Sequence, residues 1–128
     1  MLFVCIGNSC RSQMAEAFAR AYGADVIEAH SAGLAPASII MPHTRAVLAE
    51  KNLSMDGQFP KSLEMVAREP FDIVVNMSGR KLPSPSGRVI EWPVPDPVGE
   101  PEETYRAVAA QIEGLVMRLI LELRSQPE

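Results

Sequence analysis

The start of the chain constrains its fold more than any other segment. An apolar run over Met1–Cys5 is typical of a buried parallel strand, and the polar Gly7–Ser9 segment ends it. A helical pattern then runs from about Ser12 to Tyr22, where Gly23 is a typical C-terminal stop. The sequence therefore predicts a strand, a tight loop and a helix in direct succession, which is the opening unit of an α/β fold.

The rest of the chain continues this alternation. Further strands are predicted at Asp25–His30, Phe71–Met77 and Arg88–Trp92, and helices at His43–Lys51 (after Pro42), from Ser62 to a point before Pro70, and at Glu102–Leu123. Loops are predicted at Ser78–Gly87 and Pro93–Pro97. This order is typical of a parallel sheet with helices on both faces, where ligands bind beyond the carboxyl ends of the strands. No repeat or linker divides the chain, so we expect one domain over residues 1–128.

Composition argues against several classes of partner. The chain has 16 acidic and 12 basic residues, a formal net charge of −4, whereas nucleic acids and anionic membranes require clustered Lys and Arg. The longest apolar stretch, Leu115–Leu123, is interrupted by charges and too short for a membrane span, and the first residues lack the basic lead-in of a signal peptide. Two cysteines in one loop do not form a disulfide framework. We therefore expect a reduced, cytoplasmic protein without nucleic-acid or membrane partners.

The loop between the first strand and the first helix has the residues of an oxyanion-binding cradle. Cys5 is followed by five residues and then by Arg11, whose planar guanidinium can bind two oxygens of a tetrahedral anion. Backbone N–H groups of the loop can turn inward, and the positive end of the following helix points at the same place. In that field we expect Cys5 to be a thiolate, with the Ser12 hydroxyl donating a hydrogen bond to the sulfur. The residues expected to bind the oxyanion are Ile6, Gly7, Asn8, Ser9, Cys10, Arg11 and Ser12.

Asp96 and Cys10 are further candidates for chemistry. Asp96 lies between two prolines that hold it rigidly, and a reaction at a thiolate needs a group that protonates the leaving oxygen and later activates water. Cys10 has two interpretations, either a small residue packed under the loop or a redox partner of Cys5. His30 and His43 have no Cys or Asp partner at ligand spacing, so we expect neither a metal nor another cofactor.

Together these residues resemble the low-molecular-weight protein tyrosine phosphatase family, which includes thiol-dependent arsenate reductases. The resemblance covers nearly the whole chain: the Cys5–Ser12 loop, Ser31–Gly33, the Phe71–Met77 strand, Asp96 with Pro97, and the last helix. It implies a three-layer, phosphatase I-like (flavodoxin-like) fold with a four-stranded parallel sheet and helices on both faces.

The resemblance also implies roles for individual residues. Cys5 would be the nucleophile, and Asp96 the general acid and base. Arg11 would bind the oxyanion, and Ser12 would stabilise the thiolate. By the same resemblance, Asn8 is expected to support the loop through hydrogen bonds, with Ser31 as its partner.

The two branches of this family leave different marks on the chain. The Ser9–Glu16 and Trp92–Gly99 segments are similar to arsenate reductases, and Val98 stands where phosphatases typically carry an aromatic residue. However, the reductases that use thioredoxin carry two more cysteines in the loop after the third strand, where this chain has Ser78 and Leu82. The missing cysteines exclude an internal relay of three thiols.

Three functions are compatible with these residues. The favoured one is a phosphatase that hydrolyses phosphotyrosine-like phosphomonoesters, as small molecules or phosphoproteins, through a cysteinyl-phosphate intermediate. The alternative is an arsenate reductase that takes electrons from an external thiol, either a small molecule or a glutaredoxin-like partner. A second alternative is a non-catalytic oxyanion-binding or redox-sensing module, which the complete set of candidate catalytic residues disfavours. Apolar residues off the main face of the last helix, Met117, Ile120 and Leu121, permit a dimer without requiring one.

Overall fold

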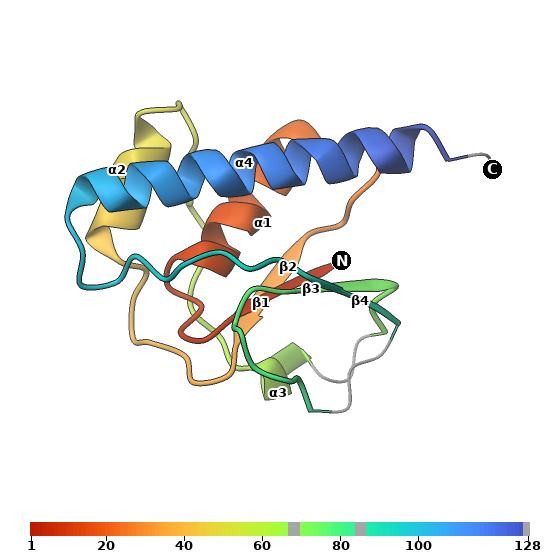
Figure 1. Ribbon diagram of the computed structural model, residues 1–128, viewed down its shortest axis with the longest axis horizontal. Coiled ribbons are helices and arrows are strands. Elements are labelled where there is room, and N and C mark those ends of the chain that lie inside the picture. The colour runs from red at the N-terminus through yellow and green to blue at the C-terminus, as the bar shows by residue number, and fades with distance from the viewer. Residues whose placement is uncertain (67–69, 84–86, 127–128) are drawn as a thin grey trace.

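A four-stranded parallel sheet forms the centre of the molecule (Figure 1). The computed structural model describes residues 1–66, 70–83 and 87–126. The strands are β1 (Leu2–Cys5), β2 (His30–Gly33), β3 (Ile73–Asn76) and β4 (Arg88–Glu91), and their order in space is β2-β1-β3-β4. The predicted α/β fold with four parallel strands is confirmed.

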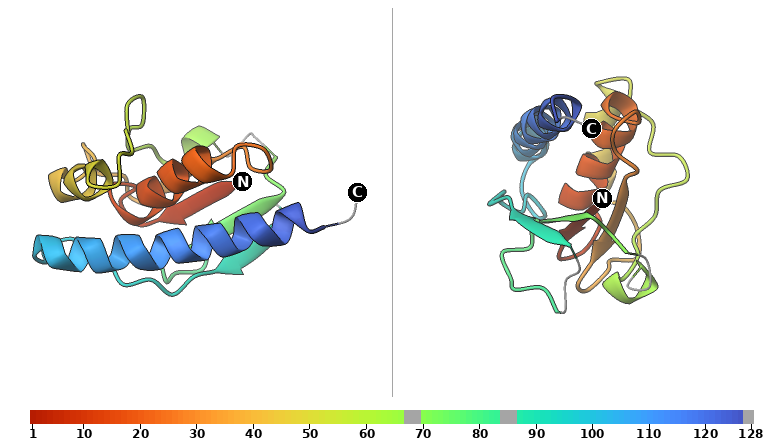
Figure 2. Two further views of the ribbon diagram at one scale, coloured as in Figure 1. Left: turned by 90° about the horizontal axis from the view of Figure 1, so that it is seen from above. Right: turned by 90° about the vertical axis from the view of Figure 1, so that its right-hand side faces the viewer.

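Helices cover both faces of the sheet, as predicted. One face carries α1 (Arg11–Tyr22), α2 (Pro42–Ala49) and α4 (Glu102–Arg124), and the other carries the single-turn α3 (Leu63–Val66), as the right-hand view of Figure 2 shows. The side chains of β1 alternate between the two faces. Phe3 and Cys5 belong to the larger core, under α1 and α4, whereas Leu2 and Val4 belong to the smaller core that contains Val66.

Parallel pairing places the carboxyl ends of β1 and its neighbours at one edge of the sheet. Cys5 is the last residue of β1 and pairs with Gly33 of β2, while Asn76 of β3 pairs with Val4 on the other side. The position of Gly33 has no room for a side chain, because a Cβ atom there would lie 2.7 Å from the carbonyl oxygen of Ile6. The loop after β1 therefore begins at the edge where parallel α/β sheets bind ligands.

The second strand lies further along the chain than the sequence pattern indicates. The prediction of a strand at Asp25–His30 is wrong, because β2 starts only at His30. The N–H groups of Val26 and Ile27 both donate to the Gly23 carbonyl, so this segment is the turn that follows α1. The apolar residues Val26 and Ile27 favour a strand locally. However, β1 pairs with the small residues of His30–Gly33, and this tertiary contact outweighs the local β-propensity.

The long helix α4 buries one face along its length. The prediction that Ile120 lies off this face is wrong, because Ile120 is fully buried and packs against Gly23, where a Cβ atom would lie only 2.6 Å from it. Leu121 is exposed and Met117 is partly buried. Among the described residues, no helix is both long enough and apolar enough to cross a membrane.

The remaining elements agree with the predictions to within a few residues at their ends, for α1, α2, β3, β4 and α4. The predicted end of the short helix before Pro70 falls on residues 67–69, outside the described part of the chain. The predicted loop at Ser78–Gly87 is irregular over residues 78–83. Residues 84–86 also lie outside the described part of the chain.

Candidate active site

A pocket opens at the carboxyl edge of the sheet, over the loop that joins β1 to α1. Its volume is about 220 Å³. It brings Asp96, from the proline-rich loop after β4, beside the loop residues Cys5 and Arg11. The residues that line it are Cys5, Ile6, Gly7, Ser9, Cys10, Arg11, Ala37, Met41, Asp96 and Val98. Of the residues predicted for the site, Asn8 and Ser12 lie beneath the pocket, fully buried.

The backbone of this loop leaves several donors free for an anion. Asn8 has a positive φ of 49°, the left-handed conformation that Asn tolerates better than most residues. Helix α1 begins at Arg11 without a side-chain cap. Within the described part of the chain, no N–H group from Gly7 to Ser12 donates a hydrogen bond to another residue. Uncapped donors at a helix start are suited to an anion.

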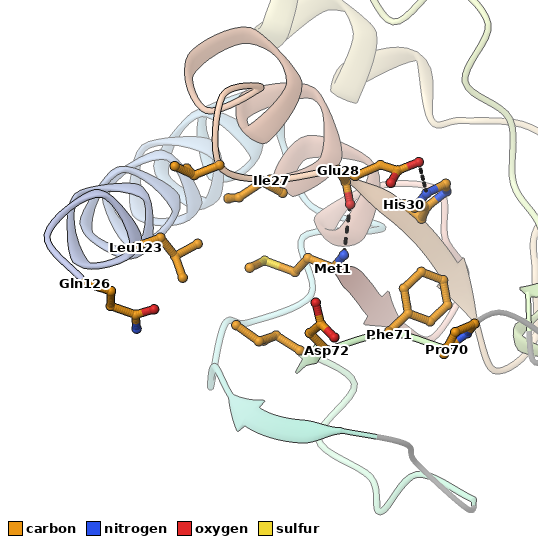
Figure 3. A pocket seen from close by; sticks show the side chains of 11 residues that line it. Met1, Ile27, Glu28, His30, Pro70, Phe71, Asp72, Leu123 and Gln126 are labelled. Atoms are coloured by element: carbon orange, nitrogen blue, oxygen red, sulfur yellow. Dashed lines mark hydrogen bonds and ion pairs between the residues drawn. The ribbon is translucent and has the colours of Figure 1, made fainter. Parts of the chain in front are cut away.

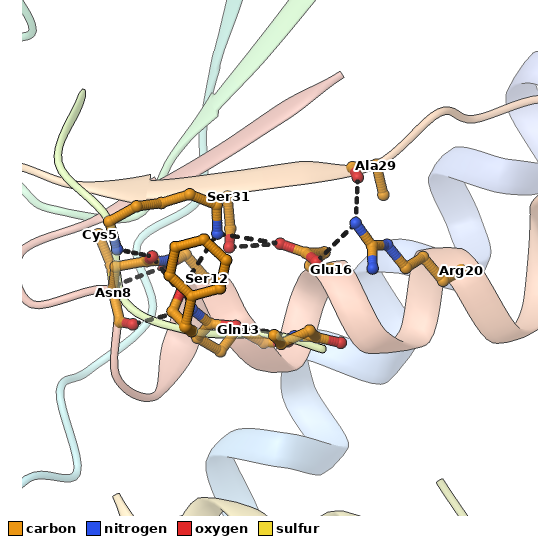
Figure 4. Close-up of polar contacts among 11 residues, drawn as sticks. Cys5, Asn8, Ser12, Gln13, Glu16, Arg20, Ala29 and Ser31 are labelled. Carbon is orange, nitrogen blue, oxygen red and sulfur yellow. Dashed lines mark hydrogen bonds and ion pairs between the residues drawn. The ribbon is translucent and has the colours of Figure 1, made fainter. Parts of the chain in front are cut away.

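The Cys5 sulfur is hydrogen-bonded to a hydroxyl. The Sγ atom lies 2.9 Å from the Oγ atom of Ser12, and Asn8 Nδ2 donates to the same Oγ at 2.7 Å (Figure 4). Because Ser12 accepts from Asn8, its own hydrogen is available for the sulfur. The geometry suits stabilisation of a thiolate, whether as a nucleophile or as a leaving group.

The Arg11 side chain connects the loop after β1 to the segments that follow β3 and β4. Its Nη1 donates to the backbone carbonyls of Met77, just after β3, and of Val94, at 3.0 Å for the latter. Its Nη2 lies 3.7 Å from a carboxylate oxygen of Asp96, whose side chain is 46% exposed. The other Asp96 oxygen accepts from the N–H of Val98 at 3.1 Å. A buried cation and a solvent-accessible carboxylate therefore face one small pocket.

Cys10 differs chemically from Cys5. Both cysteines are free thiols. Burial raises the pKa of the Cys10 thiol to about 12, and the nearby Thr44 hydroxyl only partly offsets this effect. Cys10 is therefore protonated near neutral pH and a weak nucleophile, which favours the packing role. Its redox pairing with Cys5 stays a prediction.

The expected hydrogen bond between Asn8 and Ser31 is not present. Ser31 instead donates to the buried carboxylate of Glu16, which also pairs with Arg20 at 2.9 Å (Figure 4). Glu16 lies one helical turn beyond Ser12 on α1, and this position places its carboxylate, instead of the Asn8 amide, next to Ser31 of β2. Asn8 bonds instead to Ser12, Gln13 and the N–H of Lys61.

Two buried glutamines near the loop were not indicated by the sequence. The Gln13 side-chain amide donates to Asn8, and the Gln58 side chain donates to Gln13. In the predicted helix, Gln13 is a polar residue outside the apolar positions, which by itself indicates a side chain facing solvent. Gln58 is 45 positions away from Gln13, and no pattern in the sequence links the two.

A larger cavity, of about 710 Å³, lies at the opposite edge of the sheet, at the amino ends of the strands (Figure 3). In it, the amino group of Met1 donates to the Glu28 carbonyl at 2.8 Å, and His30 lies 3.6 Å from the Glu28 carboxylate. Apart from these residues, its lining is Val26, Ile27, Pro70, Phe71, Asp72, Ile73, Leu123 and Gln126. It contains none of the predicted site residues, so size alone does not identify the reactive pocket.

Comparisons with known proteins identify relatives of this chain. The family model "Low molecular weight phosphotyrosine protein phosphatase" matches residues 1–86. A protein of Synechocystis sp. described as "Glutaredoxin arsenate reductase" is 34% identical over 96% of this chain and 97% of its own length.

Solved structures of both branches share the fold. An arsenate reductase from Archaeoglobus fulgidus is 35% identical and superposes with a TM-score of 0.83, over 93% of this chain and 97% of that one. A protein tyrosine phosphatase is 26% identical with a TM-score of 0.86, over 99% and 97% of the two chains. The chain therefore belongs to the low molecular weight phosphotyrosine protein phosphatase family, as one of its cysteine-dependent enzymes.

Proposed function

We propose that this protein is an arsenate reductase that completes its reaction with an external thiol. The observation that carries the proposal is the lining of the pocket over Cys5. The outer wall consists of Ala37, Met41 and Val98, and no described lining residue is aromatic. A pocket of about 220 Å³ with this wall suits a small inorganic oxyanion and offers no ring that would stack on a phenyl phosphate. The arsenate reductases among its relatives support the same choice.

The first step is the attack of the Cys5 thiolate on the arsenic of arsenate. A sulfur–arsenic bond forms, and one oxygen leaves as water after Asp96 donates a proton to it. Arg11 and the free N–H groups of the loop balance the negative charge on the remaining oxygens. Arsenic is still pentavalent at this stage.

The second step reduces arsenic. An external thiolate attacks the Cys5 sulfur, a disulfide bond forms, and the electron pair of the sulfur–arsenic bond passes to arsenic, which leaves as trivalent arsenite. A second thiol then attacks the mixed disulfide and releases Cys5 as a thiolate. Two thiols are oxidised to one disulfide for each arsenate reduced, so the electrons balance.

The cysteine content supports an external source of electrons. The chain has two cysteines, both in the same loop, and the pKa of Cys10 is raised to about 12. Ser78 and Leu82 stand after β3, and Leu82 is buried in the smaller core. We infer that the first external thiol is a small molecule and that a glutaredoxin supplies the thiol that reduces the mixed disulfide; the name of the Synechocystis relative suggests this partner.

Phosphatase activity is the second candidate, because the same cradle fits phosphate and Asp96 lies at its mouth. In that reaction Cys5 would attack phosphorus, and water would then hydrolyse the cysteinyl-phosphate.

One comparison tests the choice. The purified protein is assayed for arsenate reduction with glutathione, glutaredoxin, glutathione reductase and NADPH, and separately with thioredoxin and its reductase. Hydrolysis of p-nitrophenyl phosphate and of a phosphotyrosine peptide is measured in parallel. We expect arsenate turnover with glutaredoxin, little with thioredoxin alone, and poor hydrolysis of the peptide. Efficient peptide hydrolysis without arsenate turnover would establish the phosphatase instead, and rapid turnover with thioredoxin alone would contradict the proposed partner.

A further inference from the structure

A chain of buried side chains leads from Gln58 to the sulfur of Cys5. Gln58 Nε2 donates to Gln13 Oε1 at 2.7 Å, and Gln13 Nε2 donates to Asn8 Oδ1 at 3.0 Å. Asn8 Nδ2 donates to Ser12 Oγ at 2.7 Å, and this oxygen lies 2.9 Å from Cys5 Sγ. Figure 4 shows the end of the chain nearest the sulfur. It joins a loop after α2 to the candidate nucleophile.

Backbone groups fix the direction of this chain. Gln13 Nε2 also faces the carbonyl oxygens of Asn8, at 3.0 Å, and Phe59, at 2.9 Å, which can only accept. The N–H of Lys61, which can only donate, lies 2.9 Å from Asn8 Oδ1. The backbone partners therefore identify the amide atoms, with a nitrogen of Gln13 toward Asn8 and a nitrogen of Asn8 toward Ser12.

The orientation of the Asn8 amide decides where the Ser12 hydrogen points. With its nitrogen toward Ser12, as observed, Asn8 occupies an acceptor site and leaves the hydroxyl hydrogen for the sulfur. A rotated amide would place an oxygen there, and Ser12 would donate to this oxygen instead of to Cys5. Water does not replace the lost contact, because Asn8, Ser12 and Gln13 are fully buried.

Gln58 holds the far end of the chain. Its side chain donates to both the side-chain and the backbone oxygen of Gln13, the latter at 3.2 Å, and Gln58 is 8% exposed. Without it, the Gln13 amide oxygen would be buried without a partner, which is costly and favours another rotamer. The position of Gln13 therefore depends on Gln58.

We propose that Gln13, held in place by Gln58, is a positioning residue that keeps the Ser12 hydroxyl directed at the Cys5 sulfur. The inference rests on the proposed function through the assignment of Cys5 as nucleophile, whichever oxyanion it attacks. If the two glutamines had a purely structural role, their replacement would lower the stability of the protein and leave the reactivity of Cys5 unchanged. The dependence of Cys5 reactivity on pH separates the two roles.

The test uses two variants of nearly equal volume, Gln13→Met and Gln58→Met. The rate of alkylation of Cys5 by iodoacetamide is measured from pH 6 to pH 10 by mass spectrometry of the Cys5 peptide. A hydrogen bond to a charged group is worth enough to lower the rate at pH 7 about tenfold in Gln13→Met and about threefold in Gln58→Met. At pH 10, above the ordinary pKa range of cysteine thiols in general, we expect rates within about twofold of the wild type.

Ser31→Ala is the matched control. It removes a fully buried hydroxyl that donates to Glu16, which lies on α1 like Gln13. The Ser31 hydroxyl makes no contact with the Cys5 sulfur. We expect it to lower the melting temperature and to leave the pH profile of alkylation unchanged. If the glutamine variants melt earlier but keep the wild-type pH profile, the proposal is overturned. If Gln13→Met does not fold, Gln58→Met decides by the same criterion.

The assay needs no arsenate, so its result does not depend on the reductase activity. Failure of arsenate turnover would leave this test unaffected. A wild-type Cys5 that resists alkylation at every pH would instead contradict its assignment as the nucleophile, and the positioning role with it.

Discussion

The two cysteine environments of the oxyanion loop differ in hydrogen bonding more than in burial. Cys5 and Cys10 are each 2% exposed and both line the pocket. Beside Cys5, the Ser12 hydroxyl lies 2.9 Å from the sulfur and is itself oriented by Asn8. Beside Cys10, the buried Thr44 hydroxyl has no hydrogen bond of normal geometry, although it lies near enough to lower the pKa of the thiol slightly. An oriented donor suits a thiolate, whereas burial without one keeps a thiol neutral.

Replacement of each cysteine by serine is expected to give the largest difference in activity between the two sites. Cys5→Ser should lower arsenate turnover by at least about 10³-fold, since a hydroxyl is a far weaker nucleophile near neutral pH. Cys10→Ser should keep a measurable fraction of activity, because a neutral thiol is replaced by a neutral hydroxyl. Steady-state kinetics of the two variants, with their melting curves as the folding control, provide the measurement. Equal losses in both would remove the distinction between the two environments.

Removal of the carboxyl group at the mouth of the pocket is expected to have the next largest effect. Asp96→Asn cannot protonate a leaving oxygen, and general acid catalysis typically contributes about 10²- to 10⁴-fold. The loss should be strong for an alkyl or tyrosyl phosphate and smaller for an activated aryl phosphate, whose leaving group needs less protonation. Rates on the two phosphate esters, taken as a ratio to wild type, test this. An equal loss on both would mean that Asp96 only positions its loop.

The raised pKa of Cys10 predicts a stability change at alkaline pH. The folded-state value of about 12 lies above the ordinary value of 9.0, so the thiol is protonated in both states below pH 9 and contributes no penalty there. Between pH 9 and 12 the unfolded chain loses this proton while the folded protein retains it, so the free energy of unfolding falls as the pH rises.

Urea unfolding of the wild type and of Cys10→Ser across this range isolates the effect, because the other alkaline groups are common to both proteins. We expect the difference between the two curves to grow from pH 9 to pH 12. Parallel curves would show that Cys10 titrates normally in the folded protein.

The sequence predicted the features that depend on neighbouring residues. The loop from Cys5 to Ser12 is contiguous, so its strand, turn and helix follow from local patterns, and these residues lie together in the structure. Asp96 lies in the same pocket although it is distant in sequence, and its candidacy depended on the Cys5 loop, whose chemistry needs a proton donor. The β2 register and the Gln13–Gln58 contact come from tertiary packing, which no local pattern encodes.

The smallest effect is expected from Thr44→Val. The Thr44 hydroxyl is fully buried without a hydrogen-bond partner, and valine has nearly the same shape. Because loss of an unpartnered polar group removes a desolvation cost, the free energy of unfolding at pH 7 should change by less than about 1 kcal/mol.

Ser12→Ala removes the corresponding hydroxyl beside Cys5 and should lower turnover about 10- to 100-fold, since that hydroxyl is hydrogen-bonded to the sulfur. Urea unfolding and arsenate kinetics of both variants are the measurements. A Thr44→Val protein that loses as much activity as Ser12→Ala would show that the Cys10 side of the loop also takes part in the chemistry.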